Sequence, residues 1–201
     1  MTKNGARERR CGCLAGREWK GAFGLNEDRG LDEPISLVSY DPSWPERALA
    51  LANEVDVALG DLKGSIEHVG STAIAGMVAK PIIDLMIGLE APSVMESVAA
   101  RLRAAGWDDL GEAGVAGRRY FRRRLSEAAN LHLVQRGGEH WIKSLALRDY
   151  LRAHPDEALT YGRLKQEIVM QGHRRLLAYS AHKAAHMSAL VAKARRWIGG
   201  E

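Results

Sequence analysis

The stretch of sequence with the clearest chemical potential is Gly70-Ser71-Thr72, which follows a predicted strand over 64–69 and opens a short helix. Unpaired backbone N–H groups at such a turn, together with two hydroxyl groups, suit the binding of an anion, most often a phosphate. The stretch is not a Walker motif, because Gly76 is followed by Met77 rather than by lysine. The structural alternative is a strand-to-helix turn whose glycine permits positive φ and whose hydroxyl caps the helix.

A single carboxylate, Asp84, lies in a predicted strand over 81–89 that is apolar on both faces. Because side chains alternate along a strand, Lys80, Asp84 and Met86 share one face. An ionised aspartate in such surroundings is costly unless a cation, a metal ion or a hydrogen-bond donor faces it. Asp84 is therefore predicted to carry a metal ion or act as a general base, with a structural salt bridge as the alternative.

Further cationic side chains could complete a site for an anion. Arginines gather on a predicted hairpin strand over 118–125, and Arg119 and Arg122 are the two expected to contact phosphate, since a guanidinium matches two of its oxygens. His132, in the next strand, could share a proton with Asp84. A basic hairpin exposed to water and a structural histidine are the alternatives.

Four residues outside that hairpin belong to the same predicted site. Lys80 would neutralise charge that develops on a phosphate, Arg148 could extend the basic wall from a helix, and Lys183 could close over the ligand. His68, beside the turn, is expected to play a structural part near the site. For Arg148 and Lys183 the alternative is a side chain that simply faces water.

Hydrophobic periodicity predicts the elements that must position these residues. Helices on one side of a small mixed sheet, followed by a C-terminal helical tail, define an α+β domain. Residues 1–33 are glycine-rich and show no period, so they are predicted to be a flexible extension of a domain over 34–201. The predicted helices cover about 45–60, 92–105, 141–154, 155–170 and 178–197, and the predicted strands cover 35–40, 64–69, 81–89, 107–110, 118–125 and 130–135.

Composition limits the class of protein. The 201 residues are 46% hydrophobic and 27% charged, which is typical of one globular domain with a sizeable core. No apolar run approaches the roughly 18 residues that span a bilayer, so we expect a cytoplasmic protein without a membrane partner. The net charge of +4 is mild. The sequence also lacks a dense basic block with interleaved aromatic residues, which argues against a nucleic-acid partner.

Several separated motifs occur along the chain in an order that resembles the bacterial GrpB family. The resemblance covers residues 35–197 and implies a nucleotidyltransferase-like fold of the polymerase-β type. In some bacteria the same module resembles a C-terminal extension of dephospho-CoA kinase. The motifs are His68-Val69-Gly70-Ser71-Thr72-Ala73, Lys80-Pro81-Ile82-Ile83-Asp84, Tyr120-Phe121, Asn130-Leu131-His132-Leu133-Val134, the segment 147–155, and Tyr161, Lys165, Tyr179 and Lys183.

The resemblance implies that Gly70 and Ser71 grip phosphate and that Asp84 takes the first acidic position of a two-magnesium site. The second acidic position is Met86, whose thioether is a poor magnesium ligand. The predicted function is therefore binding of a nucleotide or other phosphorylated small molecule, with nucleotidyl transfer at an incomplete magnesium site as an activity to test. The alternative is a non-catalytic accessory, folding or regulatory domain related to the one attached to dephospho-CoA kinase.

Overall fold

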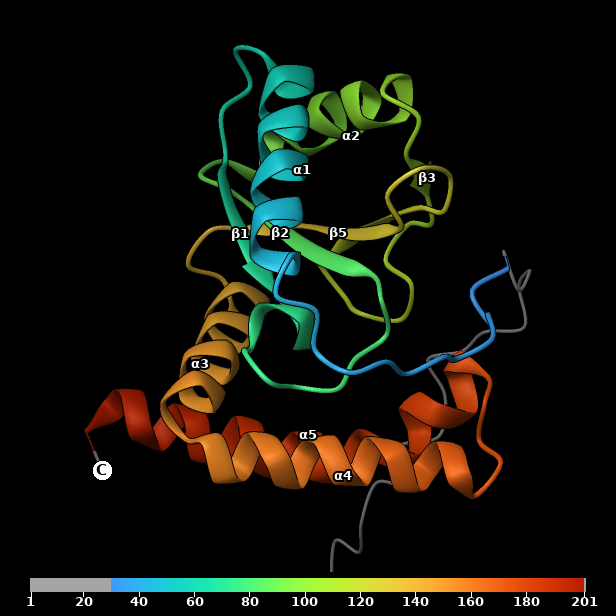
Figure 1. Ribbon diagram of the computed structural model, residues 1–201. Coiled ribbons are helices and arrows are strands. Elements are labelled where there is room, and N and C mark those ends of the chain that lie inside the picture. Colours follow the sequence, from blue (N-terminus) through green and yellow to red (C-terminus); the bar gives the residue numbers. More distant parts are fainter. Residues whose placement is uncertain (1–29, 201) are drawn as a thin grey trace, which may run out of the picture.

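The computed structural model describes residues 30–200, so the predicted extension over 1–33 lies almost entirely outside the described residues (Figure 1). Five strands and five α-helices make up the described chain, together with two short 3₁₀ helices, η1 and η2. In chain order these are α1 (Trp44–Leu59), β1 (Ser65–Val69), η1 (Ser71–Ala73), β2 (Ile83–Leu89), η2 (Pro92–Val94), α2 (Met95–Ala104), β3 (Asp108–Asp109), β4 (Arg119–Arg123), β5 (Ala129–Gln135), α3 (Glu139–Ala153), α4 (Pro155–Met170) and α5 (Leu176–Gly199).

The strands form one mixed sheet in the order β1-β2-β5-β4-β3. Only the central pair, β2 and β5, is parallel, and the other neighbours are antiparallel. The register sets Asp84 beside Asn130 and Met86 beside His132, so these four side chains share one face of the sheet. The predicted α+β class with a small mixed sheet is confirmed.

Helices cover both faces of the sheet, and the prediction that they lie on one side is wrong. Helices α1 and α2 pack on the face that carries Leu85 and Phe121, where the main hydrophobic core lies. The N-terminal end of α3 packs on the opposite face, because Trp141 contacts Met86 and Val134 there. This second packing places α3 next to the polar end of the sheet face that carries Asp84.

The predicted helical tail is present. Helices α4 and α5 lie side by side below the sheet, and α3 connects them to it (Figure 1). Tyr150 and Leu151 of α3 meet Tyr161 of α4 and Leu190 of α5 in a second apolar cluster. None of the helices within residues 30–200 has the length and hydropathy required to cross a bilayer.

Two predicted elements are shorter than the sequence pattern indicates. The segment 35–40 is not a strand, because it makes only isolated bridges, Pro34 with Arg175 and Val38 with Ala79, to two different parts of the chain. It therefore runs as a strap between the α4–α5 loop and the segment before β2. The short helix that Gly70-Ser71-Thr72 is predicted to open is the single turn η1, and Gly76, with φ +74°, follows it.

We expect Phe121→Ala to destabilise the domain by about 3–5 kcal/mol, because the side chain is fully buried between the sheet and α1 and α2. Chemical denaturation followed by circular dichroism measures this free energy of unfolding. Val57→Ala, on the exposed side of α1, is the control and should change it by no more than about 0.5 kcal/mol. Equal effects of the two substitutions would contradict this placement of the core.

Candidate functional site

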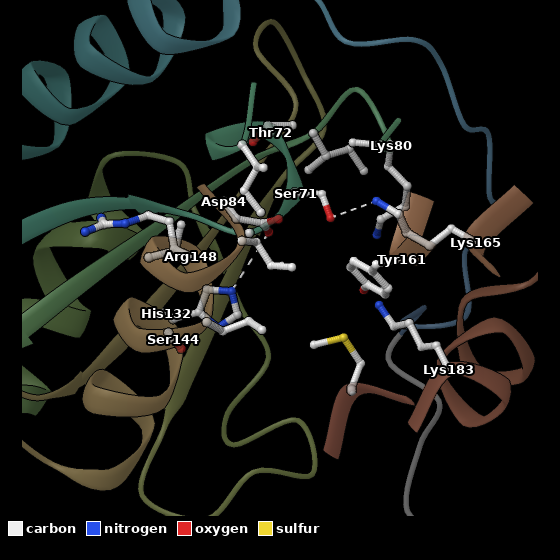
Figure 2. A pocket seen from close by; sticks show the side chains of 18 of the residues that line it. Ser71, Thr72, Lys80, Asp84, His132, Ser144, Arg148, Tyr161, Lys165 and Lys183 are labelled. Atoms are coloured by element: carbon white, nitrogen blue, oxygen red, sulfur yellow. Dashed lines mark hydrogen bonds and ion pairs between the residues drawn. The ribbon is translucent and has the colours of Figure 1, made fainter. Parts of the chain in front are cut away.

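A cavity of about 280 Å³ opens between the turn after β1, the start of β2 and the C-terminal helices (Figure 2). The turn contributes Gly70, Ser71 and Thr72 to its lining, and β2 contributes Asp84. The remaining polar lining includes Lys80, His132, His140, Ser144, Tyr161, Lys165, Tyr179 and Lys183. The turn with its hydroxyl groups and the lone carboxylate therefore face one cavity, as two parts of a single site must.

The turn lies against Asp84 because residue 70 is glycine. Gly70 has φ +73° and ψ −170°, a backbone conformation that essentially only glycine adopts without strain. A Cβ atom at this position would lie 3.0 Å from Asp84 Cβ and closer still to its carboxylate. Residue 70 therefore has two independent reasons to be glycine, and the second is the approach of the turn to the acid.

Asp84 is held by donors from the neighbouring strand. Asn130 Nδ2 donates to Asp84 Oδ1 at 2.7 Å, and His132 Nε2 lies 3.9 Å from the same oxygen. The Asp84 side chain is 25% exposed, on the side of the cavity. Burial acts to raise the pKa of Asp84, but His132, Lys80 and Asn130 together outweigh it, so the pKa lies below its usual value. Asp84 is therefore ionised at neutral pH.

A chain of hydrogen bonds fixes the Asn130 amide. Asn130 is 5% exposed, and its Oδ1 accepts from Arg124 Nη2 at 2.9 Å. Arg124 in turn donates to both carboxylate oxygens of Glu33, each at 2.8 Å. Because Arg124 can only donate, the Asn130 oxygen must face it and the amide nitrogen must face Asp84.

The same reasoning assigns the tautomer of His132. Arg118 Nη1 lies 3.4 Å from His132 Nδ1, and a guanidinium has no acceptor. His132 Nδ1 therefore accepts, and Nε2 carries the hydrogen that points toward Asp84. The neighbouring His140 ring stacks on His132, and its pKa is lowered to about 4, by burial first and then by His132 and Arg118.

Lys165 is the most deeply buried cation of the site. Its side chain is 2% exposed, and Nζ donates to Ser71 Oγ at 3.1 Å and to the backbone carbonyl of Val78. The Tyr161 ring lies 4.7 Å from the same nitrogen. Burial, followed by the charge of Lys183, lowers the pKa of Lys165 to about 7.

Two further lysines face the cavity. Lys183 Nζ lies 4.9 Å from the centre of the Tyr179 ring, and burial lowers its pKa although Asp84 acts in the opposite direction. Burial also lowers the pKa of Lys80, against the opposing charges of Asp84 and Glu33. The ammonium groups of the cavity are thus destabilised in their charged forms and would gain from an added anion.

His68, in β1, holds Thr72, the last residue of the turn, in position. His68 Nε2 and Thr72 Oγ1 are 2.9 Å apart, and Thr72 is almost fully buried. Burial is the main cause that lowers the pKa of His68 to about 4; Asp84 acts in the opposite direction, and Arg152 and Arg148 add to the lowering. His68 is therefore neutral at physiological pH and does not line the cavity.

The structure does not bring the two hairpin arginines to the cavity. Arg119 points to the opposite face of the sheet, where it binds Asp109 at 2.6 Å and also Glu96. Arg122 donates to the backbone carbonyl of Gly30 at 2.6 Å. Neither residue lines the cavity, so their placement does not support the predicted contact with a phosphate held there.

Arg148 lines the cavity with its aliphatic part only. Its guanidinium points away from the cavity in Figure 2 and donates to Glu67 Oε2 at 2.7 Å and to Asp149 Oδ1 at 2.8 Å. A third hydrogen bond goes to the carbonyl of His68 at 3.1 Å. Arg148 therefore ties α3 to β1, which corrects its predicted placement in a basic wall.

The donor set does not fit a pair of magnesium ions. Met86 is fully buried among Val69, Val134 and Trp141, so the second acidic position belongs to the core. Asp84 is the only carboxylate among the described residues that line the cavity. Within residues 30–200 no three histidine, cysteine or acidic side chains gather as a metal site would require. Magnesium prefers several hard oxygen ligands, which one carboxylate does not supply.

Sequence reasoning did not assign Lys165 to the binding residues, although the chain contains a signal for it. Ala158, Tyr161 and Ile168 form the buried stripe of α4, and Lys165 lies on that stripe, four residues after Tyr161. A lysine within an apolar stripe must be paired or must face a cavity, because an unpaired buried ammonium is costly.

Comparison with known proteins gives consistent matches along most of the chain. A family model described as GrpB protein matches residues 34–193. UPF0157 protein YqkA of Bacillus subtilis is 30% identical over 167 residues, which are 83% of this chain. The chain spans about half, 49%, of the length of YqkA. Dephospho-CoA kinase of Mycobacterium tuberculosis is 38% identical over 80 residues, which are 20% of that protein.

Among solved structures, the conserved protein GrpB from Enterococcus faecalis superposes with a TM-score of 0.73 and 28% identity. The match covers 81% of this chain and 99% of that one. The Cid1 poly(U) polymerase is a distant neighbour, with a TM-score of 0.44 and 12% identity, a likeness too weak to bear on function.

We expect Gly70→Ala to destabilise the protein more than Gly76→Ala, as measured by the free energy of unfolding. Both glycines have almost the same positive φ, +73° and +74°, so each substitution incurs a backbone strain of about 1–3 kcal/mol. Only at residue 70 would the new Cβ overlap Asp84, whereas the space around residue 76 is open. Equal losses would show that the turn does not press against Asp84.

Proposed function

We propose that this chain, which belongs to the GrpB family, binds the phosphate groups of a nucleotide or other phosphorylated small molecule in the cavity between the turn and the C-terminal helices. Ser71 and Lys165 would contact one phosphate, with Lys80 and Lys183 around it. The remainder of the ligand would lie against the apolar wall that Ile74, Leu147 and Met187 supply. The volume, about 280 Å³, lies just below the roughly 300–1,000 Å³ typical of small-molecule sites.

One observation carries this proposal, namely the excess of positive charge in the cavity. Three lysines face a single carboxylate there, among the described residues. Neither Lys165 nor Lys183 forms an ion pair with an acidic side chain of residues 30–200. Phosphate is the common small-molecule group whose charge and oxygens would satisfy several ammonium groups and a hydroxyl at once.

Magnesium is not required by this arrangement. The lysines can neutralise phosphate directly, whereas Asp84 is already engaged by Asn130 and His132. We therefore favour binding over two-metal nucleotidyl transfer, and Asp84 would balance the lysine charges in the free protein. General-base action by Asp84 and proton sharing between Asp84 and His132 stay predictions from the sequence.

A second candidate is a non-catalytic accessory domain. The observation that favours it is the buried Met86, which replaces a carboxylate that metal-dependent transfer would use. The partial similarity to dephospho-CoA kinase fits such a domain, because a small module can be attached to an enzyme without taking part in its chemistry. This candidate differs from the first only if the cavity binds no phosphorylated compound.

A thermal-shift panel of nucleotides and coenzyme A precursors tests the proposal. At a ligand concentration of 100 Kd, binding stabilises by about 2.7 kcal/mol, which corresponds to about 5–10 °C in the midpoint of a domain of this size. We expect at least one compound to produce such a shift, with or without magnesium. Failure of every compound to shift the wild-type midpoint would reject phosphate binding and leave the accessory candidate.

Lys183→Met should weaken the binding of that compound at least about tenfold, a loss of about 1.4 kcal/mol, because it removes a cation from the cavity. Lys63→Ala is the matched control, since Lys63 is 67% exposed and lies outside the cavity lining. Titration calorimetry measures both. A similar affinity for wild type and Lys183→Met would mean that the ligand binds elsewhere.

The affinity should also decrease with rising pH above neutrality. A bound phosphate raises the pKa of Lys165 from about 7, so the ligand-bound form holds a proton that the free form has lost. The full affinity is then present below about pH 7 and declines as pH rises through the free-state pKa, up to about tenfold per unit. Calorimetry between pH 7 and 9, where phosphate is largely ionised, should report proton uptake. An affinity that stays constant across this range would contradict the contact with Lys165.

A further inference from the structure

The closest pair of chemically reactive groups in the cavity is the Ser71 hydroxyl and the Lys165 amine. Their Oγ and Nζ atoms are 3.1 Å apart and come from elements 94 residues apart in sequence (Figure 2). Ser71 is half-buried and lines the cavity, so a substrate can reach its hydroxyl. A nucleophile and a base within hydrogen-bond distance form the arrangement that covalent catalysis by serine requires.

We propose that Ser71 is a nucleophile activated by Lys165, and that the cavity hydrolyses or transfers the acyl group of a small ester or thioester. This activity goes beyond the phosphate binding proposed above and does not depend on it. Three observations support it: the 3.1 Å contact, the burial of Lys165, and the absence of an acidic partner for that lysine within residues 30–200.

Lys165 is placed to act as a base at neutral pH. An ordinary lysine is fully protonated there, but burial and the nearby Lys183 charge lower the pKa of Lys165 to about 7. The titratable groups that line the cavity with it are Lys183 and Tyr179 of α5, Tyr161 of its own helix, His140 and Arg148 of α3, and Lys80, Asp84 and His132 on the side of the sheet. A neutral Lys165 can still donate to the carbonyl of Val78 while its lone pair accepts the Ser71 hydrogen.

The residues around Ser71 hold it in a fixed position. The Gly70 backbone lies against Asp84, and Thr72, the next residue, is anchored by His68. Lys80 and Lys183 supply positive charge on the same cavity, where an oxyanion would form. Ser71 thus has a base on one side and cations near the position of its target carbonyl.

The proposed reaction balances without a cofactor. The proton of Ser71 Oγ moves to Lys165 Nζ as Oγ bonds to the acyl carbon, and the carbonyl oxygen becomes an oxyanion. When the oxyanion collapses, the bond to the leaving alcohol or thiol breaks, and that group takes the proton from Lys165. Water then attacks the acyl-serine, gives its proton to Lys165, and Lys165 returns it to Ser71 as the carboxylic acid leaves.

A fluorophosphonate probe tests the proposal, because it forms a covalent P–O bond with an activated serine and releases fluoride. We expect peptide mapping of the labelled wild-type chain to place the modification on Ser71, with a labelling rate that increases with pH around a midpoint near 7. Ser71→Ala should abolish labelling. Lys165→Met and Lys165→Arg should slow it at least a hundredfold, because neither side chain can accept the proton near neutral pH.

Ser188→Ala is the control, since Ser188 is exposed on α5 and lies outside the cavity lining. Its labelling rate should equal that of the wild type. Because Lys165 also supports the Val78 segment, the thermal midpoint of each variant is recorded, and the wild-type pH profile supplies a readout free of substitutions. Absence of labelling at Ser71 up to pH 9, or a rate indifferent to Lys165→Arg in a folded variant, would overturn the proposal. Neither outcome depends on whether a nucleotide binds.

Discussion

The structure depends on keeping one carboxylate ionised inside an apolar strand. Asp84 lies near the start of β2, where its side chain is partly exposed to the cavity, and Asn130, His132 and Lys80 compensate its charge. The compensation extends outward, because Arg124 and Glu33 fix the Asn130 amide. A buried charge without these partners would cost several kcal/mol. The sheet register that sets Asn130 beside Asp84 is therefore needed to stabilise this charge.

The positions of the other site residues follow from that carboxylate. Gly70 allows the turn to approach Asp84, which directs Ser71 into the cavity, and α4 and α5 close the cavity with lysines. Met86, two residues further along the strand, packs under Trp141 instead of binding metal. The result is a cavity whose charge comes from amines with lowered pKa values. Such a cavity favours anions and, at Lys165, proton transfer near neutral pH.

The sequence predicts those elements and site residues that depend on neighbouring positions along the chain, but not those that depend on contacts between distant segments. Alternation along β2 places Asp84 and Met86 on one face, and the Gly70-Ser71 turn follows β1 as predicted. The predicted phosphate contact of the hairpin arginines is not supported, because the ion pair of Arg119 with Asp109 depends on strand pairing that hydrophobic periodicity does not reveal. Lys165 reaches Ser71 from 94 residues away, so only the packing of α4 against the turn brings them together. The lysine within the apolar stripe of α4 was the one local indication.

The proposed site holds one anion between the turn and the lysines of the cavity. The most direct measurement is a crystal structure of the protein grown with a nucleoside triphosphate in the absence of magnesium. Phosphate oxygens should then lie within about 3 Å of both Ser71 Oγ and Lys165 Nζ. A triphosphate bound at another surface, with the cavity occupied by water alone, would contradict it.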